Sequence, residues 1–408
     1  MTPIVAVVPF GAFAEESKER AGAWARSLAR RLVDRFAGAQ GIELRPVLLV
    51  AMPKGSSDPS YLVMGSAPDT AKAAEYARSL GATYALVGTY REVGGVREAH
   101  LRLVEESGSQ KAEHRTEVAP EALHLLEPEL AQWIARATHV SVDRDLTTPA
   151  TANEDSYGAL LQAMDSEVDA TLLRESDPRG SQSALARAAA TYTIAAQTDP
   201  TSSVVEERIL VMAASAIETD RQPLVLETLE TLAETRAQSW RVQYVLGEVR
   251  RTSGDVSGAI VAFEHSDALK PLRAQDVLTL ARLYITAGAP AVAASRLRRV
   301  IRSDAEAPVV AAARRLQLGI RHPELERDLE EAGKAAVDGD LSHAAEAQDK
   351  FDRVLAADPD IWEAHFGSGL LAWHRGDSAA AEASFKRAIE IDPEAAELVS
   401  EMGEPPTN

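Results

Sequence analysis

Residues 240–307 read WRVQYVLGEVRRTSGDVSGAIVAFEHSDALKPLR and then AQDVLTLARLYITAGAPAVAASRLRRVIRSDAEA, two windows of 34 residues that lie end to end. Small residues and larger apolar residues recur in both windows. The first window carries Leu246, Gly247, Gly254, Ala259, Phe263 and Pro271, and the second carries Leu280, Ala281, Tyr284, Gly288, Ala293 and Leu297. This spacing predicts a helical hairpin in each window. Such a hairpin cannot bury its apolar face alone and must stack on copies of itself.

The pattern returns near the end of the chain, where it is carried by Gly369, Ala372, Gly376, Ala381, Phe385, Ala388 and Pro393. It resembles the tetratricopeptide (TPR) repeat, and this resemblance implies a right-handed all-α solenoid. We expect about six hairpins over residues 154–395. A helix over residues 308–320 lacks a clear partner. A capping helix is expected over 393–402, and residues 396–408 comprise the end of that helix and the tail.

Residues 1–140 have a different pattern, which predicts an α+β domain joined to the repeats by a linker over 141–153. Short runs of apolar residues, continuous or alternating with polar ones, predict strands. Apolar residues spaced about 3.6 positions apart predict helices. A Gly94-Gly95 turn is expected to join two of the strands. The expected order is βαβαβββα, with strands over 4–10, 44–52, 84–90, 96–104 and 111–118 and helices over 15–36, 69–80 and 121–138.

This region resembles the TolB-like amino-terminal domain of bacteria. The resemblance rests on VAVVPF (5–10), on RSLGATYALVGTYREVGGVREAHLRLVE (78–105) and on the junction TPATANEDSYGALLQA (148–163). Residues 53–68 depart from the family, which has a shorter serine-rich turn there. The resemblance implies a protein-binding role without catalytic residues, placed ahead of TPR repeats.

Composition narrows the classes of function. The 408 residues include no cysteine, which excludes disulfides and thiolate metal sites. The net charge is −19, and residues 323–408 alone hold seven Lys and Arg against 21 Asp and Glu, a net charge of −14. No segment has the positive field that nucleic acid requires. No apolar run is long enough to span a membrane, and the chain reads as cytoplasmic, or periplasmic if a signal peptide was removed.

We find no motif that would support catalysis or a cofactor. The nine histidines show no metal-binding spacing, and there is no glycine-rich phosphate loop. Neighbouring carboxylates such as Glu105-Glu106 read as exposed charge. The sequence therefore predicts a protein that is not an enzyme and that has no catalytic, metal or cofactor residues.

The candidate partner-binding residues lie on the first helix of each hairpin, which lines the concave groove of a TPR solenoid. In the central repeats these are Arg241, Tyr244, Glu248, Arg251, Gln275 and Arg282, and in the last repeat Phe366, Leu370 and Trp373. Arginines beside a tyrosine suit an extended acidic peptide. Two simpler interpretations remain: the charges are only solvated or pair with each other, and the capping helix covers the aromatic strip.

The sequence thus predicts an adaptor or scaffold that holds a protein partner in the repeat groove. The alternative is a regulatory or ligand-sensing subunit of a bacterial signalling or envelope-associated assembly. The sequence leaves open whether the protein forms a homo-oligomer.

Overall fold

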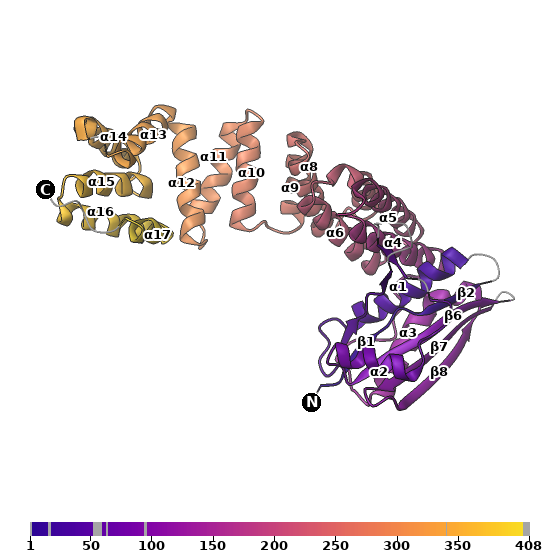
Figure 1. The fold of residues 1–408 in the computed structure, drawn as a ribbon. Helices are drawn as coiled ribbons and strands as arrows, with labels where there is room; N and C mark the ends of the chain where they lie inside the picture. Colours follow the sequence, from indigo (N-terminus) through magenta and orange to yellow (C-terminus); the bar gives the residue numbers. More distant parts are fainter. Residues whose placement is uncertain are drawn as a thin grey trace. The chain divides into compact units, whose positions relative to one another are not determined.

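The computed structural model describes residues 2–14, 18–51, 59–62, 64–93, 96–339 and 341–402 (Figure 1). The chain divides into two compact units, Met1–Gly254 and Asp255–Asn408. The first unit takes in both the α+β region and the first repeat helices. Among the described residues, no helix is both long enough and apolar enough to cross a membrane.

A mixed β-sheet forms the framework of the α+β region. Strand β1 runs parallel to β3 and to β6, while β6, β7 and β8 form an antiparallel meander. The sheet order is β3-β1-β6-β7-β8, and β2 pairs with the far end of β6. The strands are β1 (Ile4–Val7), β2 (Gly11–Ala14), β3 (Glu43–Pro46), β6 (Tyr84–Val93), β7 (Val96–Glu105) and β8 (Gln110–Val118), and β4 (Val50–Ala51) pairs with β5 (Ser60–Tyr61) in a separate ribbon.

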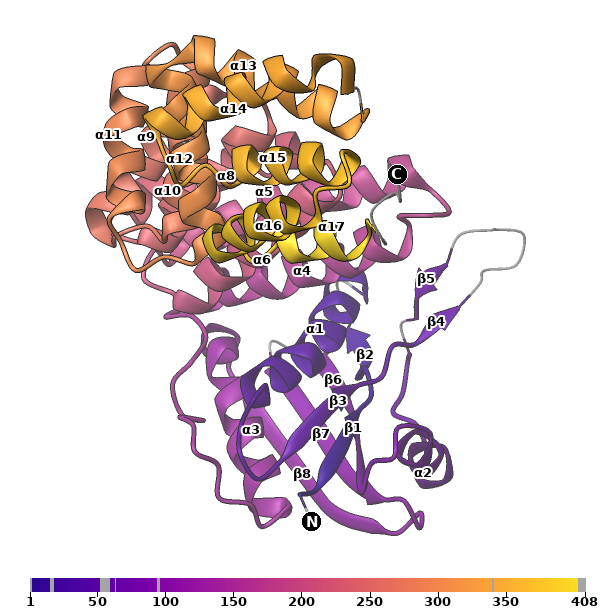
Figure 2. The same cartoon turned by 90° about the vertical axis from the view of Figure 1, so that its left-hand side faces the viewer.

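Helices cover both faces of this sheet (Figure 2). On one face, Ala73 and Ala77 of α2 (Thr70–Ser79) pack against Ala6 and Val8. On the other face lie α1 (Lys18–Phe36) and α3 (Leu126–Ala137), the latter preceded by a 3-10 helix, η1 (Pro120–Leu125). Alternate residues of β6 serve the two faces, because side chains of a strand point to opposite sides in turn.

Two strands that the sequence predicts are shorter or interrupted in the structure. Of the stretch 4–10, only residues 4–7 form a strand, β1; Pro9, which has no N–H for the ladder, lies between β1 and the start of β2 at Gly11. The stretch 44–52 divides into β3 and β4, and Met52 is outside the described residues. The predicted Gly94-Gly95 turn also falls outside them.

Five α-helices complete the first unit after residue 153. Four of them begin at a side chain that accepts a hydrogen bond from a backbone N–H three residues later, which satisfies a donor that the helix leaves open. These caps are Asn153, Asp177, Ser202 and Ser239. The helices are α4 (Glu154–Leu172), α5 (Pro178–Thr198), α6 (Ser203–Glu218), α7 (Leu226–Thr235), which follows η2 (Gln222–Leu224), and α8 (Trp240–Thr252).

The second unit is helical throughout its described residues and holds two apolar clusters. One cluster gathers residues of α10, α11 and α12, and the other gathers residues of α12 to α16. Its helices are α9 (Val256–Leu269), α10 (Ala274–Thr286), α11 (Pro290–Ile301), α12 (Ala307–Arg321), α13 (Pro323–Val337), α14 (Ala344–Ala357) after η3 (Leu341–His343), α15 (Trp362–His374), α16 (Ser378–Ile391) and α17 (Ala395–Ser400).

Helix α12, predicted as the helix without a partner, contributes to both clusters. Its Ala313 belongs to the first cluster and its Leu318 to the second. The predicted capping helix over 393–402 is shorter than expected, since α17 ends at Ser400.

The last hairpin shows why small residues recur in the repeat pattern. Helices α15 and α16 cross so closely that a Cβ atom added to Gly369 would lie 2.5 Å from the ring of Phe385. Phe385 is 7% exposed and fixed in the core, so it cannot move aside without a loss of packing. In α13, by contrast, a Cβ atom added to Gly333 would meet open space.

We therefore predict that Gly369→Ala lowers the free energy of unfolding by about 1–3 kcal/mol through overpacking. The matched variant Gly333→Ala should raise it by about 0.5–1 kcal/mol, because alanine restricts the unfolded chain and favours the helix. Urea unfolding followed by circular dichroism measures both. Equal effects of the two substitutions would contradict the close helix crossing.

Candidate partner-binding site

The predicted groove residues of α8 are engaged in surface ion pairs. The Nη2 atom of Arg241 lies 2.6 Å from Oε2 of Glu207 on α6, and both side chains are about half exposed. Arg251 pairs with Glu248 on its own helix at 2.7 Å. Tyr244, which lies between Arg241 and Glu248 in the sequence, is half buried. Exposed pairs of this kind contribute about 0–1 kcal/mol and exchange readily for another partner.

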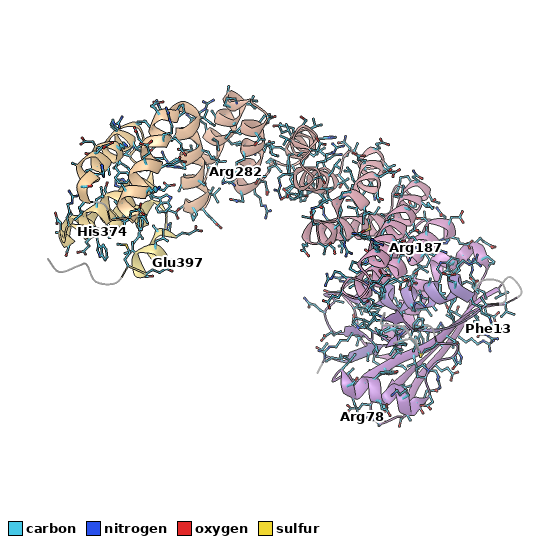
Figure 3. All side chains as sticks on the ribbon, turned by 45° about the horizontal axis from the view of Figure 1, so that its top comes forward. Phe13, Arg78, Arg187, Arg282, His374 and Glu397 are labelled. Atoms are coloured by element: carbon cyan, nitrogen blue, oxygen red, sulfur yellow. The ribbon has the colours of Figure 1, made fainter. Side chains whose placement is uncertain are left out.

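In the second unit, Gln275 and Arg282 are exposed on α10. Figure 3 labels Arg282, whose side chain forms no ion pair with any residue that the structure describes. The three predicted aromatic-strip residues lie on α15. Leu370 is 8% exposed and belongs to the core, whereas Phe366 and Trp373 are half buried and pack against it. The Phe366 ring lies 5.5 Å from the ring of Phe385 between centroids.

A cavity of about 860 Å³ opens in the first unit, beside Arg241. Helix α6, the end of α1 and the linker residues 144–152 supply most of its wall. Its charged lining residues are Arg31, Arg35, Arg144, Arg208 and Arg241 on the cationic side and Asp34, Asp199 and Glu207 on the acidic side.

Two of the acidic groups in this cavity are held by the protein itself. The Asp199 carboxylate accepts hydrogen bonds from the N–H groups of Ala152 (2.7 Å) and Thr201 (3.0 Å). Burial by itself would raise the pKa of Asp199, but these hydrogen bonds outweigh it and lower the pKa. Asp34 lies 3.5 Å from Arg31 and 3.9 Å from Arg208. Asp199 therefore stays ionised, with its oxygens occupied by hydrogen bonds, whereas the charge of Asp34 is balanced by the two arginines.

Four of the five arginines of the cavity pair with carboxylates: Arg31 and Arg35 with Glu127, Arg208 with Glu167, and Arg241 with Glu207. Arg144 is exposed and forms no ion pair within the described part of the chain. The amino-terminal end of α6, at Ser203 and Val204, also lines the cavity and adds the positive end of a helix dipole. The part of the lining formed by Arg144 and the start of α6 is therefore suited to a negatively charged group.

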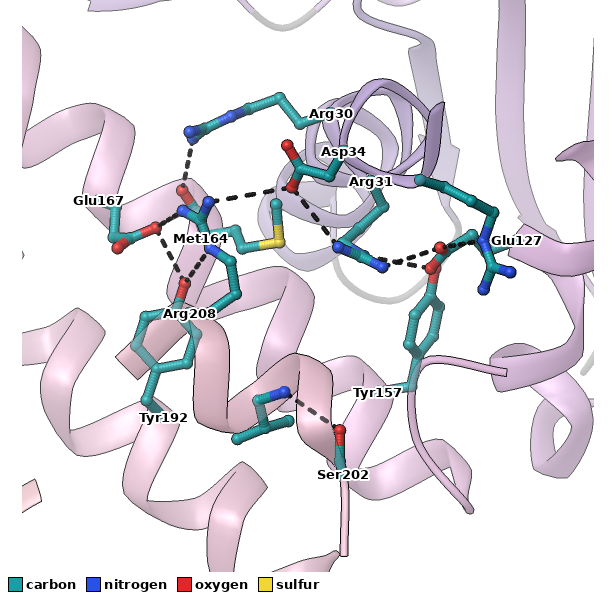
Figure 4. A network of polar contacts seen from close by, with 12 residues as sticks. Arg30, Arg31, Asp34, Glu127, Tyr157, Met164, Glu167, Tyr192, Ser202 and Arg208 are labelled. Atoms are coloured by element: carbon teal, nitrogen blue, oxygen red, sulfur yellow. Dashed lines mark hydrogen bonds and ion pairs between the residues drawn. The ribbon is translucent and has the colours of Figure 1, made fainter. Parts of the chain in front are cut away.

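Behind the cavity lies a buried network around Glu127 (Figure 4). The Glu127 side chain is completely buried, and its Oε1 atom lies 3.0 Å from Arg31 Nη2 and 2.8 Å from Arg35 Nε. The hydroxyl of Tyr157 donates to Oε2 at 2.9 Å. Burial by itself would raise the pKa of Glu127, but the two guanidinium groups hold it below its ordinary value. These contacts join α1, α3 and α4.

Further polar contacts tie α1 to α4. Arg26 makes a two-point ion pair with Asp165, with Nε–Oδ1 and Nη2–Oδ2 distances of 2.8 and 2.5 Å, and both side chains are buried. The indole N–H of Trp24 donates to the Gly158 carbonyl at 3.1 Å. Sequence reasoning did not find this interface. The feature of the sequence that could have indicated it is the set of arginines at 26, 31 and 35, which flank the apolar face of α1.

No group of three or more metal-ligating side chains occurs in the described ranges. The arginine-lined cavity is a polar feature of the first unit with room for a ligand.

One family model, described as a tetratricopeptide repeat, matches residues 333–396. The match covers the end of α13 and all of α14 to α16, and it supports the TPR part of the predicted fold. No curated protein matches the chain in sequence. The TolB-like resemblance of the amino-terminal region has no counterpart in these comparisons and stays a prediction.

Several solved structures are similar to the chain. They include YrrB, described as a TPR protein with an unusual peptide-binding site (17% identity, TM-score 0.28, covering 52% of this chain and 100% of that one). Others are MamA (16%, 0.27, 55% and 97%) and a tetratricopeptide repeat protein from Parabacteroides merdae ATCC 43184 (11%, 0.32, 60% and 98%). TM-scores of this size carry no argument about function.

We predict that Glu127→Gln destabilises the first unit by about 3–5 kcal/mol, because it leaves Arg31 and Arg35 buried without a counter-charge. The exposed Glu121→Gln change in η1 should stay within about 0.5 kcal/mol. Urea unfolding followed by tryptophan fluorescence measures both. A loss below about 1 kcal/mol for Glu127→Gln would contradict the network.

The lowered pKa of Glu127 also predicts a pH dependence. The carboxylate contributes stability above its unfolded pKa of 4.5, and that contribution falls as the pH drops through the lower folded value. The wild-type free energy of unfolding should therefore decline below about pH 4.5, and Glu127→Gln should decline less steeply. Unfolding midpoints measured between pH 7 and about pH 3 test this expectation. Parallel profiles would contradict it.

Proposed function

We propose that this protein is a non-enzymatic adaptor that holds a partner protein on its repeat helices, and that the arginine-lined cavity receives an acidic segment of that partner. The observation that carries the proposal is the position of Arg241, one of the predicted groove residues, at a cavity with four further arginines. The TPR-type repeats support the general role in protein interaction.

The chemistry of the cavity supports an acidic segment. A partner carboxylate can replace Glu207 at Arg241, because that pair is exposed and weakly held. Arg144 offers a second guanidinium, and guanidinium–carboxylate hydrogen bonds are among the stronger ones in proteins. Val211, which is 46% exposed in the same lining, offers an apolar contact.

The net charge of −19 does not prevent this interaction. At physiological salt the Debye length is about 8 Å, so acidic groups beyond that distance act weakly on a bound segment. The arginines in direct contact dominate at the cavity.

The volume of the cavity favours a second candidate, a subunit that senses a small anionic ligand. Small-molecule sites commonly have volumes of about 300–1,000 Å³, and this cavity lies within that range. A small ligand would raise the unfolding temperature of the protein by mass action without any peptide.

We expect the full chain to select acidic peptides from a phage library of random segments of about 12 residues. The double variant Arg144→Glu/Arg241→Glu should bind a selected peptide at least about tenfold more weakly, since two charge-assisted contacts are reversed. Fluorescence anisotropy with the labelled peptide measures the affinity.

Arg187→Glu provides the matched control, because Arg187 is exposed on α5 outside the cavity (Figure 3). It should change the affinity by less than about twofold. Selection of no peptide, or equal binding by the double variant, would contradict the adaptor proposal at this site. If a panel of anionic metabolites instead raises the unfolding temperature of the wild type only, the sensing role is the correct one.

A further inference from the structure

An apolar groove of about 510 Å³ lies along α16 and α17 in the second unit. Its apolar lining residues are Trp373, Ala381, Phe385, Ile389, Val399 and Met402. Ser378, Glu382, Lys386 and Glu390 complete the lining, and few polar atoms lie between these side chains. Leu398 of α17, next in sequence to Val399, is 42% exposed.

The groove exists because α17 is short. In the hairpins before it, the first helices α10 and α15 have 13 residues each, whereas α17 has six. Helix α17 packs on α16. It thereby takes the position in which the first helix of a further repeat would lie. It covers only part of the apolar face that a helix of full length would bury, and no other described residue covers the remainder.

Neither the residues that follow nor a second copy of the chain matches this groove chemically. Residues 403–408, GEPPTN, carry no large apolar side chain other than proline, and Pro405-Pro406 disfavours a helix. A second copy would bring two surfaces of like sign together, since residues 323–408 have a net charge of −14.

The lining carries two glutamates against one lysine, Lys386, so its charge favours a basic partner. Glu382 forms no ion pair with any described residue, and Glu390 pairs only with the exposed Arg387, at 3.2 Å. The two glutamates are eight positions apart on α16, a separation of about 12 Å along a helix. Basic side chains two turns apart on a neighbouring helix can therefore reach both carboxylates.

We propose that this groove binds a basic amphipathic helix of a partner protein, which lies against α16 and α17 on the part of the apolar face that α17 leaves uncovered. The partner helix places an apolar stripe on Phe385, Ile389 and Met402. Its flanking Lys or Arg side chains pair with Glu382 and Glu390. This site uses other residues than the arginine-lined cavity and takes a partner of opposite charge, so it does not depend on the function proposed there.

The test uses the full chain and a fluorescein-labelled helical peptide of about 15 residues, with Leu at every third or fourth position and Lys on both flanks. One control peptide has the same composition in scrambled order, and another has Glu in place of each Lys. We expect saturable binding of the basic amphipathic peptide only, weakening as NaCl rises from about 0.05 to about 0.3 M.

Two protein variants test the acidic rim. Glu382→Lys/Glu390→Lys should weaken binding at least about tenfold, while the control Glu218→Lys/Glu234→Lys should change it by less than about twofold. The control replaces two exposed glutamates of the first unit and alters the net charge equally. Ile389→Glu should abolish binding. Its control is Val261→Glu, at a position on α9 that is 65% exposed, and this change should leave binding intact.

The proposal is overturned if the scrambled or the acidic peptide binds as well as the basic amphipathic one, or if none binds. It is also overturned if the two charge-reversal variants behave alike. Sedimentation velocity tests the other occupant: a concentration-dependent dimer that Ile389→Glu abolishes would assign the groove to a second copy. Circular dichroism verifies that each variant keeps the wild-type helix content.

Discussion

The buried carboxylate of Glu127 is the contact on which the first unit depends. It lies in the first turn of α3, where a helix dipole favours negative charge, and it meets two guanidinium groups of α1 and the hydroxyl of Tyr157 on α4. A buried ion pair adds little net stability compared with apolar packing, but its removal leaves uncompensated charges. The α+β region and the first repeat helices therefore belong to one compact unit.

The repeat helices could be predicted from sequence because their determinants are local. The pairing of Gly369 with Phe385 recurs at a fixed spacing, and the close crossing that it permits requires only neighbouring helices. The breaks in the predicted strands were missed, although Pro9 marked one of them. Helix α17 was predicted too long, because the apolar pattern continues to Met402 beyond the last helical turn.

The candidate site was predictable only in part. Arg241 was expected in the concave groove of the repeats, and its side chain is about half exposed at the edge of a cavity. The cavity beside it joins Arg35, Arg144 and Arg208, which are far apart in the sequence and belong to a helix, the linker and a repeat. No periodic pattern in the sequence indicates that these three arginines come together in the fold. Leu370 was expected on an aromatic strip that is either open or covered by the capping helix, and in the structure it packs into the core of the last repeats.

Helix α12 has a consequence for how the second unit unfolds. In a linear array, each repeat is coupled to its neighbours through the interface that they share, and the strength of that coupling decides whether the array melts in stages. Because α12 gives Ala313 to one cluster and Leu318 to the next, disorder of either cluster removes a wall of the other. The helix that breaks the repeat pattern thus makes the two clusters a single cooperative element, in which partial melting from the carboxyl-terminal end is disfavoured.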